Sequence, residues 1–203
     1  AVQFINCPFQ GSTGHAILGT GFYANGCRFT NIGKSAVDLS TTIPQLETTV
    51  LDACYIEKVG SVTGSAALVA APGHKLRVRG TTIFCPHESS AQAVSGFRGR
   101  GALAVSTRRP HAASNFVFER SWLYGGGDYV VSALSADSGN APTGVRILEC
   151  RIGDPATHSD PAGELGYVAS TADVGFIAQG NLSDADGQLI GTLNTHPGVG
   201  WYW

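Results

Sequence analysis

Short stretches of alternating apolar and polar residues recur along this chain. Each contains a small residue followed two positions later by a large apolar one. The stretches are spaced by roughly 20 to 40 residues, the range in which solenoid repeats occur. Seven segments show the pattern, at 2–9, 22–29, 49–56, 76–83, 116–123, 145–152 and 175–182. Their small residues are Cys7, Cys27, Cys54, Thr81, Ser121, Cys150 and Gly180.

The alternation predicts strands with one buried face, and a single break in it predicts a bend. In the first segment Val2 and Phe4 alternate, and Cys7 and Phe9 resume the pattern after the break. Two short strands are therefore expected to meet at a corner. A third apolar run usually follows a polar turn, at 16–18, 36–37, 67–69, 129–131, 167–168 and 189–190. Three strands and a loop of variable length are typical of one coil of a parallel β-helix.

The second repeat carries a more specific pattern. Residues 24–33 read Ala-Asn-Gly-Cys-Arg-Phe-Thr-Asn-Ile-Gly, which resembles the coil of right-handed parallel β-helix proteins of the pectate-lyase-like superfold. The resemblance covers most of the chain. It implies an all-β fold, a single right-handed parallel β-helix (β-solenoid) of about seven coils with three short strands per coil. The superfold includes pectate lyases, polygalacturonases, uronate epimerases and bacteriophage tailspikes, so it constrains function only loosely.

The catalytic signatures of the plant-polymer enzymes in this superfold are missing. The chain has no Gly-His-Gly, no Asp-Asp pair and no Arg-x-Pro-x-x-Arg. The tailspike and depolymerase β-helix domains are the relatives least tied to fixed motifs. A solenoid rich in Gly, Ser, Thr and Ala, with uneven loops, is most similar to those domains.

Composition agrees with an extended all-β protein, because 43% hydrophobic residues with 14% charged ones supply a continuous core and 27 glycines supply turns. We expect one β-helix domain over 1–203, with a long basic insertion loop at 86–114 and a capping segment at 192–203. The chain starts inside a strand pattern without Met, so we expect a processed product or a fragment. A net charge of −2 gives no attraction to nucleic acid, so we expect no nucleic-acid partner. No apolar run is long enough to span a bilayer, so we expect no membrane insertion.

The cysteines are expected to be free thiols. Four of the five lie in the small-residue column, where a thiol stacks on the equivalent residue of the next coil. Neighbouring strands lie about 4.8 Å apart, which makes a disulfide between successive coils geometrically possible, and this is the alternative to free thiols. The six histidines lack the short spacings of a zinc site.

One position after the small residue, the aligned segments present an outward row that mixes aromatic and guanidinium groups. Aromatic rings stack on sugar faces, and Arg hydrogen-bonds hydroxyls or carboxylates, so the row is a candidate glycan-binding face. The alternative is ordinary strand surface. The row is Pro8, Arg28, Tyr55, Thr82, Trp122, Arg151 and Asn181.

Two positions before the small residue, a second outward column contains charges of alternating sign. Arg79 falls between Asp52 and Glu119, which predicts charge pairing across coils with a structural role. The whole column is Ile5, Asn25, Asp52, Arg79, Glu119, Leu148 and Ala178.

Four aspartates are the candidate catalytic residues. Asp154 and Asp184 fall four positions after the small residue on adjacent coils, and Asp128 and Asp186 lie nearby. Two carboxylates in reach of each other supply the acid and the base or nucleophile of glycoside hydrolysis. The alternative is a turn role, because Asp and Asn cap backbone groups at turns. No cofactor is expected, although turn carboxylates leave calcium open.

The insertion at 86–114 carries the basic residues Arg98, Arg100, Arg108 and Arg109. Long loops on a regular scaffold often build binding sites, and basic ones suit an acidic polysaccharide. Residues 101–106 are apolar enough to form an additional strand, which would raise the repeat count. The aromatic terminus at 201–203 is expected to pack as a cap rather than bind sugar.

Three functions remain open. The first is a phage tailspike-like β-helix of a virion tail or the extracellular space, a homotrimer that recognises polysaccharide and in some cases cleaves it. The second is a non-catalytic structural β-solenoid of a virion or cell surface. The third is a secreted polysaccharide lyase or epimerase, which would use Arg and Lys on an acidic substrate.

Overall fold

The computed structural model describes residues 1–39, 47–59, 67–70, 74–84, 103–105, 113–124, 131–133, 143–153, 166–168, 176–183 and 201–202. All regular secondary structure in these ranges is β-strand. No helix that could cross a membrane occurs in this part of the chain. The all-β class expected from the alternation is therefore confirmed.

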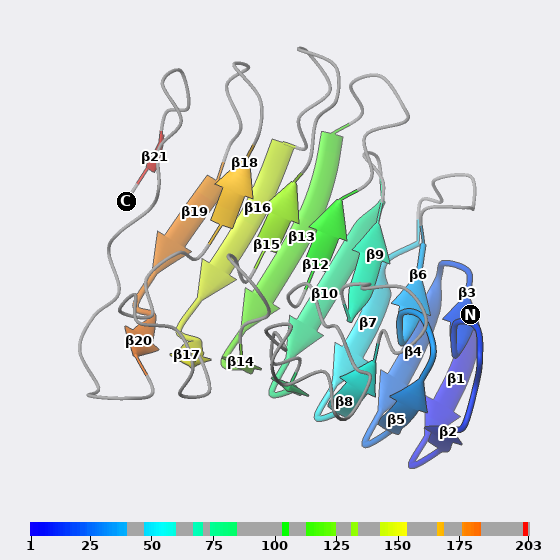
Figure 1. Ribbon diagram of the computed structural model, residues 1–203. Coiled ribbons are helices and arrows are strands. Elements are labelled where there is room, and N and C mark those ends of the chain that lie inside the picture. The colour runs from blue at the N-terminus through cyan, green and yellow to red at the C-terminus, as the bar shows by residue number, and fades with distance from the viewer. Residues whose placement is uncertain are drawn as a thin grey trace.

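The strands form three sheets in which every described pair is parallel (Figure 1). The eight-stranded sheet has the order β1 (Val2–Ile5), β4 (Phe22–Asn25), β7 (Thr49–Asp52), β10 (Lys75–Arg79), β13 (Ala113–Glu119), β16 (Thr143–Leu148), β19 (Phe176–Gln179) and β21 (Trp201–Tyr202). The seven-stranded sheet has the order β2 (Pro8–Gln10), β5 (Arg28–Ile32), β8 (Tyr55–Val59), β11 (Thr82–Phe84), β14 (Trp122–Tyr124), β17 (Arg151–Gly153) and β20 (Leu182–Ser183). The six-stranded sheet contains β3 (Ile17–Leu18), β6 (Val37–Asp38), β9 (Leu68–Ala70), β12 (Leu103–Val105), β15 (Val131–Ala133) and β18 (Gly166–Val168).

The chain visits the three sheets in a fixed order, so each repeat adds one strand to each sheet. Six complete triplets and the first two strands of a seventh are described. Strand β12 confirms the strand expected within 101–106. It pairs with β9 and β15, so it completes the fourth repeat and adds no repeat of its own. The last aromatic residues form β21, which pairs with β19 at the end of the eight-stranded sheet.

The corner between the first two strands of each repeat is made by one residue in the left-handed conformation. Its φ lies between 47° and 65° in all seven repeats. In six of them its N–H donates a hydrogen bond of 2.8 to 3.1 Å to a carbonyl of the next repeat. This single residue breaks the alternation of the sequence pattern. The seven residues are Asn6, Gly26, Ala53, Gly80, Arg120, Glu149 and Gly180.

The expected alignment of the seventh repeat is wrong by one residue. Arg151 pairs with Leu182, so Asn181, not Gly180, occupies the small-residue column. Gly180 instead takes the left-handed corner, as Gly26 and Gly80 do, because glycine adopts positive φ without steric cost. Leu182 therefore replaces Asn181 in the outward row, and Gln179 replaces Ala178 in the charged column.

The core lies between the sheets and is built from inward columns of apolar side chains. On the eight-stranded sheet the fully buried column is Ala24, Leu51, Val78, Phe118 and Ile147, and on the seven-stranded sheet it is Phe29, Ile56, Ile83 and Leu123. Partners in one column come from strands of successive repeats. Each repeat is therefore buried mainly by its neighbours.

The described cysteines are free thiols, as expected. Cys27, Cys54 and Cys150 are buried, and their thiols donate to backbone carbonyl oxygens at 3.3 to 3.5 Å. Desolvation by burial raises the pKa of Cys54 and of Cys150 to about 11. The thiols of Cys54 and Cys150 are therefore neutral at physiological pH and fill space in the corner.

Candidate binding surface

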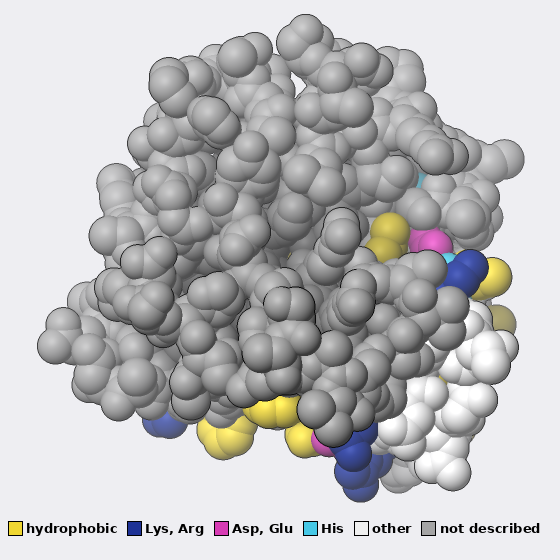
Figure 2. Space-filling model, viewed as in Figure 1, with side chains coloured by type: hydrophobic (Ala, Val, Ile, Leu, Met, Phe, Trp, Pro, Cys, Tyr) yellow, Lys and Arg dark blue, Asp and Glu magenta, His cyan; other side chains and the backbone are white. Residues whose placement is uncertain are grey.

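The outward row of the seven-stranded sheet places the candidate binding residues in register. Arg28, Tyr55, Thr82, Trp122 and Arg151 are direct partners on five successive strands. Tyr55 is 37% exposed and Trp122 is 47% exposed. Hydrophobic side chains and Lys or Arg side chains gather along the lower edge of the molecule in Figure 2, where Figure 1 places β5, β8, β14 and β17.

Arg28, Tyr55 and Glu57 form one polar and aromatic unit. The Arg28 guanidinium carbon lies 5.4 Å from the Tyr55 ring centroid, and Arg28 Nη2 donates to Glu57 Oε1 at 2.8 Å. The Tyr55 hydroxyl donates to Glu57 Oε2 at 3.4 Å. Desolvation, with a smaller contribution from the Glu57 charge, raises the pKa of Tyr55 above its usual 10.0. The phenol therefore stays a neutral hydrogen-bonding group.

Trp122 and Arg151 form the second unit. The Arg151 guanidinium carbon lies 5.8 Å from the Trp122 ring centroid, within the range of cation–π attraction. Along the strand order the row reads Arg, aromatic, Thr, aromatic, Arg. Each Arg lies on the outer side of its aromatic residue, and Thr82 lies between the two rings.

Glu57 belongs to a second outward row that the sequence analysis missed. This row lies two residues farther along the same strands, and its described side chains are Gln10, Thr30, Glu57 and Phe84, of which Thr30 is buried. The period of two in a strand could have identified it. The second row adds Glu57 as an acceptor close to Tyr55.

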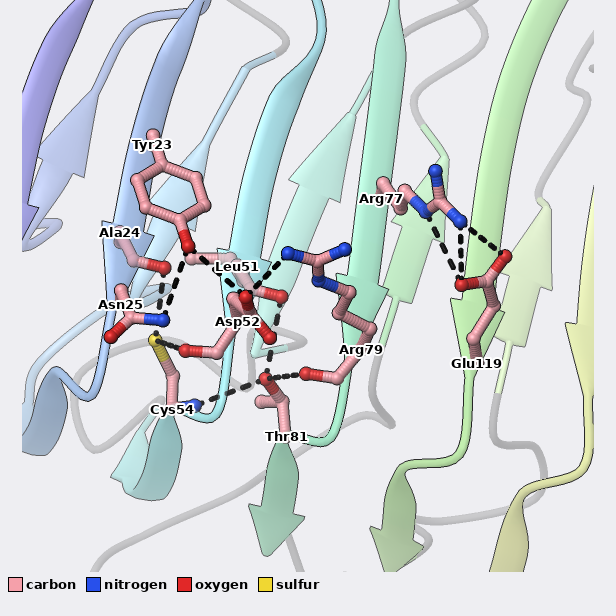
Figure 3. Close-up of polar contacts among 10 residues, drawn as sticks. All are labelled: Tyr23, Ala24, Asn25, Leu51, Asp52, Cys54, Arg77, Arg79, Thr81 and Glu119. Atoms are coloured by element: carbon pink, nitrogen blue, oxygen red, sulfur yellow. Dashed lines mark hydrogen bonds and ion pairs between the residues drawn. The ribbon is translucent and has the colours of Figure 1, made fainter.

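The charged column on the eight-stranded sheet pairs across repeats, as expected, but not with every expected partner (Figure 3). Arg79 Nη2 lies 2.6 Å from Asp52 Oδ2, which also accepts a hydrogen bond from the Tyr23 hydroxyl at 3.1 Å. Glu119 is opposite Arg79 in the register, yet it binds Arg77 through both carboxylate oxygens at 2.8 and 2.9 Å. An arginine two residues away reaches Glu119 in a fork geometry, so the expected Arg79–Glu119 pair is wrong.

The Asp52–Arg79 pair predicts a dependence of stability on pH. The hydrogen bond from Arg79 is the main cause that lowers the pKa of Asp52 below its usual 3.8. A lowered native pKa stabilises the fold above the unfolded pKa, and this contribution is lost as the pH falls through the native pKa. We expect Arg79→Met to lower the urea midpoint slightly at pH 7, with a difference from wild type that shrinks in acid.

The control for this prediction is an Asp52→Asn background, in which no carboxylate is present to titrate. There, Arg79→Met should give the same midpoint difference at every pH. A difference in the native background that stays constant down to about pH 2 would contradict the linkage.

The candidate catalytic aspartates, Asp128, Asp154, Asp184 and Asp186, lie outside the described residues. In the expected alignment Asp154 and Asp184 share one column, but the corrected register of the seventh repeat leaves Asp184 one position before that column. The described members of the column are Gly11, Asn31 and Lys58, with φ of 73°, 56° and 52°. This position is therefore left-handed in the described repeats, with Asn31 inside β5 and Lys58 inside β8. Asn and Asp adopt this conformation more readily than most residues, which favours a backbone role for Asp154. Within the described ranges no cluster of three or more His, Cys, Asp or Glu is placed to hold a metal ion.

The basic residues Arg98, Arg100, Arg108 and Arg109 of the segment 86–114 also lie outside the described residues. Of the candidate binding residues, the structure brings together Arg28 with Tyr55 and Trp122 with Arg151. Comparisons with protein-family models, curated proteins and solved structures find no match to this chain.

Proposed function

We propose that the chain is a right-handed parallel β-helix that binds polysaccharide along the outward face of its seven-stranded sheet, in the manner of bacteriophage tailspikes. Three parallel sheets that each gain one strand per repeat support the β-helix part of the proposal. In this proposal the protein belongs to a virion tail or the extracellular space, acts as a homotrimer, and binds neither nucleic acid nor membrane.

The observation that carries the proposal is the row of exposed aromatic and guanidinium groups in register. A glycan lying on this face would contact Tyr55 and Trp122, which are two strands apart. Aromatic faces stack against sugar C–H groups, and the Arg28–Glu57 pair offers donors and acceptors for hydroxyls. A surface that only registers strands has no need for two half-exposed aromatic rings on one row.

Cleavage of the bound polysaccharide is a further part of the proposal, with Asp128, Asp154, Asp184 and Asp186 as candidate catalytic residues of a glycoside hydrolase. The hydrogen bonds that link the corner residues of successive repeats, and the ion pairs across repeats, suit a stiff structural rod equally well. A non-catalytic structural rod is therefore the second candidate function. A lyase or epimerase is the third, and it would draw on arginines such as those in 86–114.

The test is incubation of the purified chain with a panel of bacterial capsular and O-antigen polysaccharides. Retention of a polysaccharide would support binding. New reducing ends that disappear in Asp154→Asn and Asp184→Asn variants would support hydrolysis, and unsaturated ends would support a lyase. A panel with neither retention nor cleavage would contradict the proposal and favour the rod.

For a polysaccharide that binds, we expect Tyr55→Ala and Trp122→Ala each to weaken affinity about tenfold, or about 1.4 kcal/mol. The reason is the loss of one stacking face in each variant. Leu18→Ala is the control, because Leu18 is an exposed apolar residue of the six-stranded sheet. Equal affinities for wild type and all three variants would remove the row from the binding site.

A further inference from the structure

The order of side chains along the outward row places Thr82 between Tyr55 and Trp122. Arg28 comes from β5, the strand before Tyr55, and Arg151 comes from β17, the strand after Trp122. Each guanidinium lies over the ring of its neighbour, so it covers the ring face that looks away from β11. The other face of each ring is turned toward β11, where the small, half-buried Thr82 lies.

We propose that Tyr55 and Trp122 form the two walls of a slot above Thr82, and that this slot binds a single pyranose ring. The inference rests on the proposed glycan-binding function and names the sugar class of that site. The two aromatic residues are two strand spacings apart, about 9.6 Å. A ring stacked on both sides needs about 4 Å on each side. The slot therefore holds one puckered ring and is too narrow for two.

Stacking on both faces selects the configuration of the sugar. A pyranose whose ring substituents are all equatorial, such as a β-linked glucose unit, presents axial C–H groups on both faces. These groups meet the electron-rich faces of both aromatic rings favourably. An axial hydroxyl, as in mannose or galactose, would point a polar group at one ring and leave it without a hydrogen-bond partner. The equatorial hydroxyls project sideways, where Glu57, two residues from Tyr55 on the same strand, offers a carboxylate acceptor.

The test compares cellotetraose, a chain of all-equatorial glucose units, with mannotetraose as the matched control. We expect cellotetraose to bind at least about tenfold more tightly. Saturation-transfer NMR should show contact from protein to protons on both faces of one glucose ring. Equal binding of the two oligosaccharides, contact to one face only, or no binding of cellotetraose would overturn the inference.

A Thr82→Phe variant tests the slot while leaving both aromatic residues in place. The new ring would fill the space above β11, so we expect cellotetraose binding to fall at least about tenfold. Unchanged affinity in Thr82→Phe would overturn the slot. Retention of panel polysaccharides that depends on Tyr55 and Trp122 but not on Thr82 would preserve the proposed function and remove only this inference. Circular dichroism and a thermal melt would confirm that the variant is folded.

Discussion

Replacement of Phe118 by alanine is expected to lower the free energy of unfolding by about 3 to 5 kcal/mol. The Phe118 side chain is fully buried in the inward column of the eight-stranded sheet. It packs between Val78 of the preceding repeat and Ile147 of the following one, which are its register partners. Truncation therefore leaves a cavity lined by three repeats, which the sheet cannot close without breaking its hydrogen-bonded register.

Val117→Ala is the matched control, because Val117 is the neighbouring residue on the same strand and points outward. Its substitution should cost less than about 1 kcal/mol. Urea denaturation monitored by circular dichroism measures both values. Similar losses in the two variants would show that the inward and outward faces of β13 have been assigned wrongly.

The contrast between Phe118 and Val117 also shows what the sequence could predict. A period of two fixes which face of a strand is apolar, so the inward columns and the three strands of each repeat could be read from alternation alone. Parallel stacking then follows from the recurrence of the same pattern. The third strand of the fourth repeat, β12, could be found in this way although it lies inside the segment 86–114.

Partner choice on the surface could not be read in the same way. Glu119 lies directly opposite Arg79, but the longer reach and fork geometry of Arg77 decide the pair. Alignment places Cα positions in a column, whereas ion pairs depend on side-chain rotamers. The period of two could place Glu57 on the same face as Tyr55, but its hydrogen bonds to Arg28 and Tyr55 depend on rotamers that the alignment does not show.

The backbone conformation at the corner is the second feature that could not be predicted from the sequence. Residue size alone points to Gly180 as the seventh member of the small-residue column, because its members in the other repeats are Cys, Thr or Ser. Asn6, Ala53, Arg120 and Glu149 also adopt positive φ at the corner, so the corner has no residue signature that a sequence reader could use. Only the register of the next strand, Arg151 with Leu182, fixes the position of Asn181.

Asn181 is therefore the site of the second large effect that we expect. Its amide is buried, with Oδ1 accepting from the Cys150 N–H and Nδ2 donating to the Ile147 carbonyl, both at 2.9 Å. Asn181→Leu leaves both backbone groups buried without these partners. At about 1 to 3 kcal/mol for each of the two unsatisfied groups, we expect the free energy of unfolding to fall by about 2 to 6 kcal/mol.

Two further variants separate this polar role from packing. Asn181→Ser should recover part of the loss, because Ser121 in the same column accepts from the Thr81 N–H at 3.2 Å and donates to the Glu119 carbonyl at 2.9 Å. Gln179→Leu removes an exposed amide nearby and should change stability by less than about 0.5 kcal/mol. If Asn181→Leu proves as stable as Gln179→Leu, the stability of the corner does not depend on the side-chain amides and hydroxyls of the small-residue column. Partial recovery by serine would instead show that residues of the small-residue column stabilise the fold by their hydrogen bonds as well as by their size. This requirement explains why Cys, Thr, Ser and Asn all occur in the column.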